Sequence, residues 1–231
     1  MAKKVIGIPG WVLGDNTFGC TKSYLNYIAQ FGKPLILTPA HEEIEDLDLL
    51  VLPGGADLSP GTYGATPNYW TGSPNMMLEW FDMVMLPKYI QAEIPIFGIC
   101  RGAQRLWTVF GGKMDQHNGW HTQSKASEPW EQCHDLFYTE KFKKKYGQDL
   151  KKVNSRHHQT MDASQHLPQD LEIIAFAGGN KPNSFYPEIV ELFQHKTLPI
   201  FGIQGHPEDM VEDDLSGKII EGFLEQKLVH I

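Results

Sequence analysis

The residue whose type and setting point most directly to chemistry is a cysteine between two glycines. Gly98, Cys100 and Gly102 form a Gly-x-Cys-x-Gly sequence at the end of the apolar run 94–99. A strand, a sharp turn and a helix in this order would raise the sulfur above a sheet as a nucleophile. The helix dipole would favour the thiolate, and the N–H of Arg101 would be free to donate to an oxyanion. The alternative is a buried, inert cysteine.

A histidine and a carboxylate near the end of the chain offer this thiol a base. His206 and Glu208 follow the apolar run 199–204. Residues two apart in an extended segment share a face, so Glu208 could orient the imidazole. His206 would take the proton from Cys100 and return it to a leaving nitrogen. Taken alone, His-Pro-Glu could also simply begin a helix.

A Gly-Gly turn provides a second backbone donor for the oxyanion. Pro53, Gly54 and Gly55 follow the apolar run 49–52. Glycines let the backbone approach a ligand closely, so we expect the Gly55 N–H to act together with that of Arg101. The alternative interpretation is a plain turn.

Alternating elements in the first half of the chain must position these residues. We expect strands at 5–8, 34–38, 49–52 and 94–99, and helices at 21–31, 78–92 and 102–110. This order predicts an α/β fold with a parallel sheet between two layers of helices. The carboxyl ends of its strands would then form one crevice.

The second half of the chain has a different pattern. Residues 112–135 show no period and predict a long loop. Strands are expected at 171–177, 188–193 and 199–204, with a hairpin-like link between the last two, and an amphipathic helix at 208–229. The chain shows no repeat or linker, so we expect residues 1–231 to form one domain.

Composition and charge exclude several classes of function. The chain has 231 residues, 28 acidic and 20 basic, with a formal net charge of -8. A negative field disfavours general binding to nucleic acid and to anionic membranes. We interpret the basic stretch 141–152 as a solvated helix end or loop. Three cysteines without a secretory leader or an apolar span predict a protein of the reducing cytoplasm.

Three short motifs resemble those of class I glutamine amidotransferase domains. They are Pro53-Gly54-Gly55, the segment 98–104 around Cys100, and Gly205-His206-Pro207-Glu208. Longer matches over 54–64, 94–102 and 153–159 resemble the γ-glutamyl-γ-aminobutyrate hydrolase group of peptidase family C26. The match runs from about residue 4 to 226. The resemblance implies a flavodoxin-like three-layer α/β sandwich with a mostly parallel central sheet and class I glutamine amidotransferase topology.

The resemblance also implies a reaction and the residues that perform it. Cys100, His206 and Glu208 would form a triad that cleaves a γ-glutamyl amide through a γ-glutamyl thioester. Gly55 and Arg101 would supply the oxyanion hole. The substrates implied are a small γ-glutamyl amide or glutamine, and the chemistry requires no metal or other cofactor.

A polar run after residue 153 is the candidate glutamyl pocket. By the resemblance, Gln104 and the segment from Ser155 to His157 line that pocket. From its own chemistry, Arg156 could pair with a carboxylate of the substrate. The alternative for the run is an exposed loop.

The chain departs from the group at two places. Leu78 and Glu79 stand where an Arg-Asp pair is usual, and Asp82 where Glu is common. Two alternatives stay open: the change alters binding of the distal part of the substrate, or it exchanges one structural ion pair for another. Gln204 stands where Trp is frequent, which alters the pocket wall.

Three functions stay open at this point. The first is a free-standing hydrolase, the second a glutaminase subunit that supplies ammonia to a separate synthetase, and the third a non-catalytic relative. A homodimer is also possible. A zinc pair of His117 and His121 has helical spacing, but Gly119 argues against a helix there. The loops 63–70 and 112–135 are candidate rims of the active site.

Overall fold

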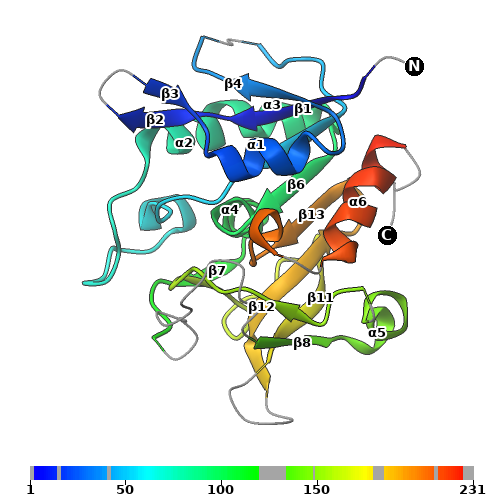
Figure 1. Cartoon of the computed structure of the whole chain (residues 1–231). Helices are drawn as coiled ribbons and strands as arrows, with labels where there is room; N and C mark the ends of the chain where they lie inside the picture. Colours follow the sequence, from blue (N-terminus) through cyan, green and yellow to red (C-terminus); the bar gives the residue numbers. More distant parts are fainter. Residues whose placement is uncertain are drawn as a thin grey trace.

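A mixed sheet of eleven strands organises the described part of the chain, with a parallel centre (Figure 1). The computed structural model describes residues 3–14, 17–40, 43–119, 134–147, 149–178, 185–210 and 213–225. The parallel strands, in spatial order, are β4 (Lys33–Leu37), β1 (Val5–Pro9), β5 (Leu49–Leu52), β6 (Ile96–Ile99) and β13 (Ile200–Ile203). Every residue of β5, β6 and β13 is buried, as expected for strands covered on both faces.

Antiparallel strands extend the sheet beyond β13. They are β12 (Phe185–His195), β11 (Leu171–Gly178), β8 (His134–Tyr138) and β9 (Lys152–Val153), while β10 (Thr160–Asp162) pairs with β12 and with β7 (Lys113–Asp115). A separate hairpin joins β2 (Trp11–Gly14) to β3 (Thr17–Gly19). The second half therefore differs in topology as well as in sequence pattern.

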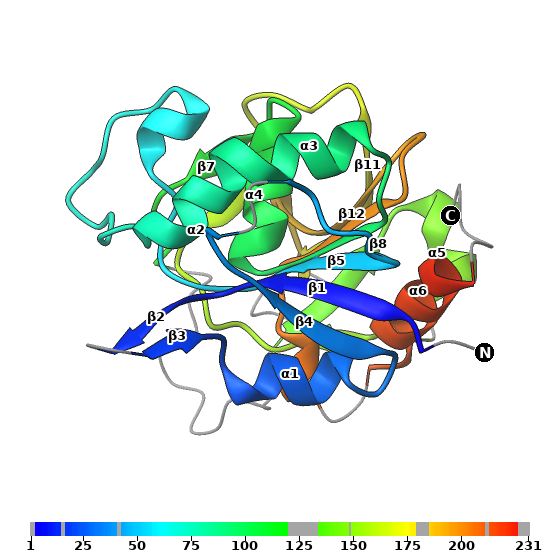
Figure 2. The ribbon, with the colours of Figure 1, turned by 90° about the horizontal axis from the view of Figure 1, so that it is seen from above.

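Helices cover both faces of the parallel centre, as Figure 2 shows. On one side lie α1 (Lys22–Ile28) and α6 (Asp214–Leu224). On the other lie α2 (Met76–Trp80), the π-helix η2 (Phe81–Met85), α3 (Leu86–Gln91) and α4 (Arg101–Val109). Each side has its own apolar core, which accounts for the predicted three-layer α/β arrangement.

The strands and helices predicted for the first half are confirmed, with ends that differ by a few residues. The helix predicted at 78–92 is observed as a continuous run from Met76 to Gln91. Asn75 begins it, because its side-chain oxygen accepts the backbone N–H groups of Met77 (3.1 Å) and Leu78 (3.3 Å). The predicted hairpin-like link is confirmed, since β12 and β13 pair antiparallel.

The helix predicted at 208–229 is wrong at its start. Residues Pro207–Asp209 form a short 3-10 turn, η3, and Met210 after them is extended. The helix α6 begins only at Asp214, where the carboxylate of Asp213 accepts the N–H of Ser216 at 3.0 Å. A local cap therefore sets the boundary that the amphipathic pattern placed too early.

The interval 112–135 is only partly a loop. It contains β7 and the first residues of β8, while residues 120–133, which include Cys133 and His121, lie outside the described part of the chain. The basic stretch 141–152 overlaps the helix α5 (Glu140–Tyr146), which buries Phe142 and Tyr146 and exposes its lysines. These elements are too short for a hydrophobic period to be visible in the sequence.

The described helices include none with the length and apolar character needed to cross a membrane. The single domain over residues 1–231 and the cytoplasmic location stay predictions.

A buried ion cluster fastens the start of α4 to the helix before it. The guanidinium of Arg101 donates to Glu79 at 2.8 Å and forms an ion pair with Asp82 at 2.8 Å, and all three side chains are buried. Burial raises the pKa of Asp82, although Arg101 and Arg105 act in the opposite direction. Glu79 and Asp82 thus serve as structural partners of Arg101. Of the two alternatives for the replacement of the usual Arg-Asp pair by Leu78-Glu79, this favours a change of structural ion pair over a change in substrate binding.

Replacing Arg101 by Met is expected to destabilise the fold strongly. It leaves the buried Glu79 without its cation and Asp82 with only the more distant Arg105 (3.7 Å), and breaking a buried ion pair typically costs about 3–5 kcal/mol of unfolding free energy. The matched control is Lys141→Met, which removes a largely exposed partner of Glu172 and should cost less than about 1 kcal/mol. Denaturant unfolding measures both, and equal losses in the two variants would contradict the structural role of the cluster.

Candidate active site

The turn that carries Cys100 has the strained geometry expected for a nucleophile. Cys100 has φ 49° and ψ -108°, a conformation uncommon for a residue with a side chain, and α4 begins at the next residue. A Cβ added to Gly102 would lie 2.3 Å from the carbonyl oxygen of Leu52, and one added to Gly98 would lie 2.9 Å from the N of Ala103. Both glycines are therefore needed for the helix to start so close to the sheet.

The base and the thiol meet because two parallel strands end side by side. In the ladder between β6 and β13, Ile99 pairs with Ile203, so the residues that follow each strand lie next to each other. Asn154 then fixes the backbone of His206: its Oδ1 accepts the His206 N–H at 2.7 Å, and its Nδ2 donates to the His206 carbonyl at 3.0 Å.

His206 lies between a sulfur and a carboxylate. Its Nδ1 is 2.8 Å from Oε1 of Glu208, and its Cε1 and the Cβ of Cys100 both lie within 3.4 Å of the point where a Cβ on Gly54 would be. Burial by itself lowers the pKa of His206, but the charge and hydrogen bond of Cys100 and those of Glu208 raise it to about 10. The arrangement favours the protonated form of the His206 imidazole.

Tyr24 on α1 touches both the base and the glycine turn, and the sequence pattern indicated only an apolar helix position there. The N–H of Gly54 donates to its hydroxyl oxygen at 3.0 Å, and this oxygen is 3.5 Å from Nδ1 of His206. Burial, followed by the charges of Glu208 and Cys100, raises the pKa of Tyr24 well above its usual value. Tyr24 thus stays protonated and joins the turn to the triad residues.

The glycine turn comes very close to these side chains. A Cβ on Gly54 would lie 2.5 Å from the hydroxyl oxygen of Tyr24 and 2.9 Å from Cε1 of His206. Since the Gly54 N–H is bonded to Tyr24, the neighbouring Gly55 is the candidate donor on this side. Arg101 is the first residue of α4, so its N–H has no acceptor within the helix.

A cavity of about 250 Å³ opens onto the sulfur of Cys100. Its lining includes Gly54, Gly55, His206 and Glu208. The lining also includes residues that the sequence did not single out as a set, and they are Trp11, Thr21, Ser23, Tyr24 and Asp209.

The predicted glutamyl-binding residues divide into two groups. Arg156 lines the cavity, and its guanidinium forms an ion pair with Asp209. Gln104, Ser155 and His157 are buried and are not among the residues that line the cavity. Of the four predicted residues, the structure therefore places Arg156 at the cavity and the other three outside its lining.

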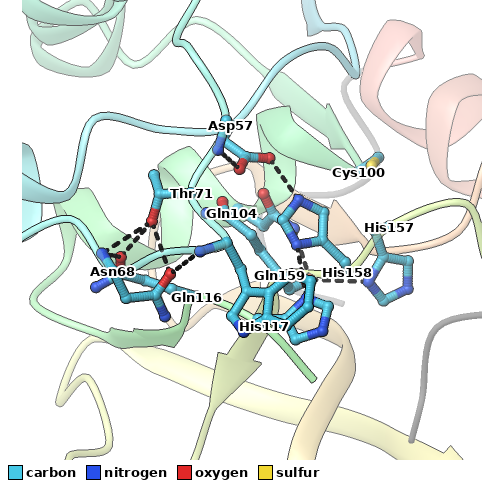
Figure 3. Close-up of polar contacts among 12 residues, drawn as sticks. Asp57, Asn68, Thr71, Cys100, Gln104, Gln116, His117, His157, His158 and Gln159 are labelled. Carbon is cyan, nitrogen blue, oxygen red and sulfur yellow. Dashed lines mark hydrogen bonds and ion pairs between the residues drawn. The ribbon is translucent and has the colours of Figure 1, made fainter. Parts of the chain in front are cut away.

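A polar network around His158 holds the segment 154–159 in place (Figure 3). Nε2 of His158 is 3.0 Å from Oδ1 of Asp57, and its Nδ1 is 3.2 Å from Nδ1 of His117. The ring of Trp70 stacks on that of His117, with centroids 4.4 Å apart. His117 is thereby engaged with His158 and Trp70, and its suggested zinc partner His121 lies outside the described residues.

Comparison with known proteins identifies relatives that match most of the length of this chain. The chain is 28% identical over 215 residues to YvdE, a glutamine amidotransferase-like protein of Lactococcus lactis, with 87% of this chain and 86% of YvdE covered. It is 28% identical over 192 residues to the carbamoyl phosphate synthase small chain of Bartonella bacilliformis, covering 83% of this chain and 40% of that protein.

The fold is shared with a glutamine amidotransferase from Thermotoga maritima, with a TM-score of 0.58, 16% identity and complete coverage of both chains. The structure therefore has the α/β fold of the class I glutamine amidotransferases. The family model of peptidase C26 matches residues 4–208. The chain belongs to the peptidase C26 family.

Proposed function

We propose that the protein is a cysteine hydrolase that cleaves a γ-glutamyl amide and releases glutamate and an amine. The observation that carries this proposal is the position of His206 beside Cys100 at the Gly54 turn, with Nδ1 of the imidazole 2.8 Å from Oε1 of Glu208. This is the nucleophile, base and orienting carboxylate arrangement of acyl transfer by covalent catalysis.

In the proposed reaction, the sulfur of Cys100 attacks the γ-carbonyl carbon of the amide. The imidazolium of His206 gives its proton to the leaving nitrogen as the C–N bond breaks, which leaves a γ-glutamyl thioester on Cys100 and frees the amine. Water, deprotonated by His206, then attacks the thioester carbon and releases glutamate. Glu208 keeps the imidazole in the orientation that both steps need.

Two backbone groups are the proposed oxyanion donors. They are the N–H groups of Gly55 and Arg101, which flank Cys100 at the end of β5 and the start of α4. Backbone donors fixed before the reaction stabilise the charge that develops on the carbonyl oxygen.

The glutamyl group is proposed to bind towards Gln104, Ser155 and His157, with its α-carboxylate near Arg156. Among the described residues, the buried Oγ of Ser155 has no hydrogen-bond partner, so it could bond to a polar substrate atom if the glutamyl pocket extends beyond the cavity that Arg156 lines. Arg156 is half-exposed and already paired with Asp209, so a carboxylate would compete with that aspartate. The small cavity favours a small amide over a drug-sized molecule.

An ammonia-supplying subunit is the second candidate function. The relative that favours it is the carbamoyl phosphate synthase small chain, of which this chain spans about two fifths. A separate synthetase would then be the partner. Because Cys100, His206 and Glu208 are all present, the hydrolase and the ammonia-supplying subunit are both favoured over a non-catalytic relative.

The proposal predicts cysteine-dependent release of glutamate from a substituted γ-glutamyl amide. The substrates are glutamine, γ-glutamyl-γ-aminobutyrate, γ-glutamylputrescine and other γ-glutamyl amides, with Cys100→Ala as the inactive form and Cys20→Ala as its matched control. Fast cleavage of one substituted amide that only Cys100→Ala abolishes supports the hydrolase. Activity on glutamine alone, dependent on an added synthetase, would instead support the ammonia-supplying subunit.

The pH dependence of kcat/KM should have an alkaline limb set by His206. Because its pKa is raised to about 10, the imidazolium that protonates the leaving nitrogen persists at neutral pH and is lost as the pH rises through about 10. Glu208→Gln removes one cause of the raised pKa and should move the limb to lower pH.

The control for this profile is Glu172→Gln, since Glu172 pairs with Lys141 rather than with the triad residues.

His206→Ala should lower the rate on the order of 10³-fold or more. A loss in Glu208→Gln that exceeds the loss in His206→Ala would contradict an orienting role for Glu208.

A further inference from the structure

Gln204 lies directly opposite Cys100 at the end of the sheet. The strands β6 and β13 pair in register, Gly98 with Gly202 and Ile99 with Ile203, so the next residue on each strand is Cys100 and Gln204. The Gln204 N–H is bonded to the carbonyl of Glu191, which holds the backbone, and the side chain is fully buried. Its Nε2 is 3.7 Å from Sγ of Cys100.

The orientation of this amide follows from a chain of contacts that begins at a backbone carbonyl. Nε2 of Gln104 donates to the carbonyl of Gln159 at 3.0 Å, and a carbonyl can only accept. The same Nε2 is 3.2 Å from Oε1 of Gln204, so Gln104 presents a donor to Gln204 as well. The remaining side of the Gln204 amide, its NH₂ group, must then face the sulfur.

We propose that Gln204 is a positioning residue that donates a hydrogen bond to the thiolate of Cys100, with its amide held in place by Gln104. This inference rests on the proposed function, because it assumes that Cys100 is the nucleophile. A hydrogen bond to the charged form of a group favours that form. Gln204 thus contacts the sulfur from the end of β13 and is not among the residues that line the cavity.

The other ionisable groups near the sulfur come from different elements. His206 follows β13, Glu208 lies on η3, and Tyr24 projects from α1. The guanidinium of Arg101, from α4, is held by Glu79 and Asp82. Gln204 is uncharged at every pH, so its removal changes the environment of the sulfur without adding or removing a titrating group.

The test is the rate at which iodoacetamide alkylates Cys100 as a function of pH, read on the Cys100 peptide by mass spectrometry. Alkylation follows the thiolate and requires no knowledge of the substrate. In Gln204→Met, which keeps the approximate size but removes the donor, the midpoint of the profile should rise by about one pH unit. In Gln104→Met, which frees the Gln204 amide to turn, it should rise by less.

The matched control is Gln194→Met. Gln194 is a second buried glutamine, on the adjacent strand β12, and its amide donates to Glu172 at 3.0 Å instead of to Cys100. Its profile should coincide with that of the unmodified protein. Thermal unfolding identifies which variants are folded, and Gln104→Met serves as the second variant if Gln204→Met fails to fold.

Two outcomes would overturn the inference. They differ in whether the assignment of Cys100 as the nucleophile also fails. If Cys100 in the unmodified protein reacts no faster at neutral pH than an ordinary thiol, the nucleophile assignment fails and the role of Gln204 fails with it. If the unmodified protein shows a reactive thiolate while folded Gln204→Met or Gln104→Met keeps the same midpoint, only the role of Gln204 is overturned.

Discussion

The close packing of α4 against β5 is the constraint on which the candidate site depends. Gly102 brings the first turn of the helix against the carbonyl of Leu52, where any Cβ would clash, and Cys100 takes the resulting strain at φ 49°. The ion cluster around Arg101 secures this helix start on its far side. The sulfur therefore lies at the helix N-terminus, and in-register strands place Gln204 beside it.

The buried polar groups around the sulfur are arranged so that each has a defined role. Glu208 and Cys100 favour the protonated imidazole of His206, while Tyr24 links the base to the Gly54 turn. In a low-dielectric interior such networks are strong when satisfied and costly when broken. The same reasoning explains why the site is held by Asn154, which binds both the N–H and the carbonyl of His206, rather than by a flexible loop alone.

Much of this could be predicted from the sequence, where periodicity and local motifs act over short distances. The buried strand before Cys100, the elbow glycines and the nearness of His206 to Glu208 followed from such patterns and are observed in the structure. The roles of Tyr24 and Gln204 could not be predicted, because they arise from strand register and helix packing between residues far apart in the chain. The start of α6 was missed because a single cap at Asp213 decided it. The resemblance, and not any spacing, suggested the glutamyl pocket, and Gln104, Ser155 and His157 as its lining stay predictions.

The most direct measurement of the central claim is capture of the γ-glutamyl thioester on Cys100. The protein is mixed with the γ-glutamyl amide that it cleaves fastest, quenched in acid at short times, and digested for mass spectrometry; a parallel reaction contains neutral hydroxylamine. We expect one glutamyl group on the Cys100 peptide and glutamyl hydroxamate in the parallel reaction. Steady release of glutamate with an unmodified Cys100 peptide at every time and no hydroxamate would contradict a covalent mechanism at this cysteine.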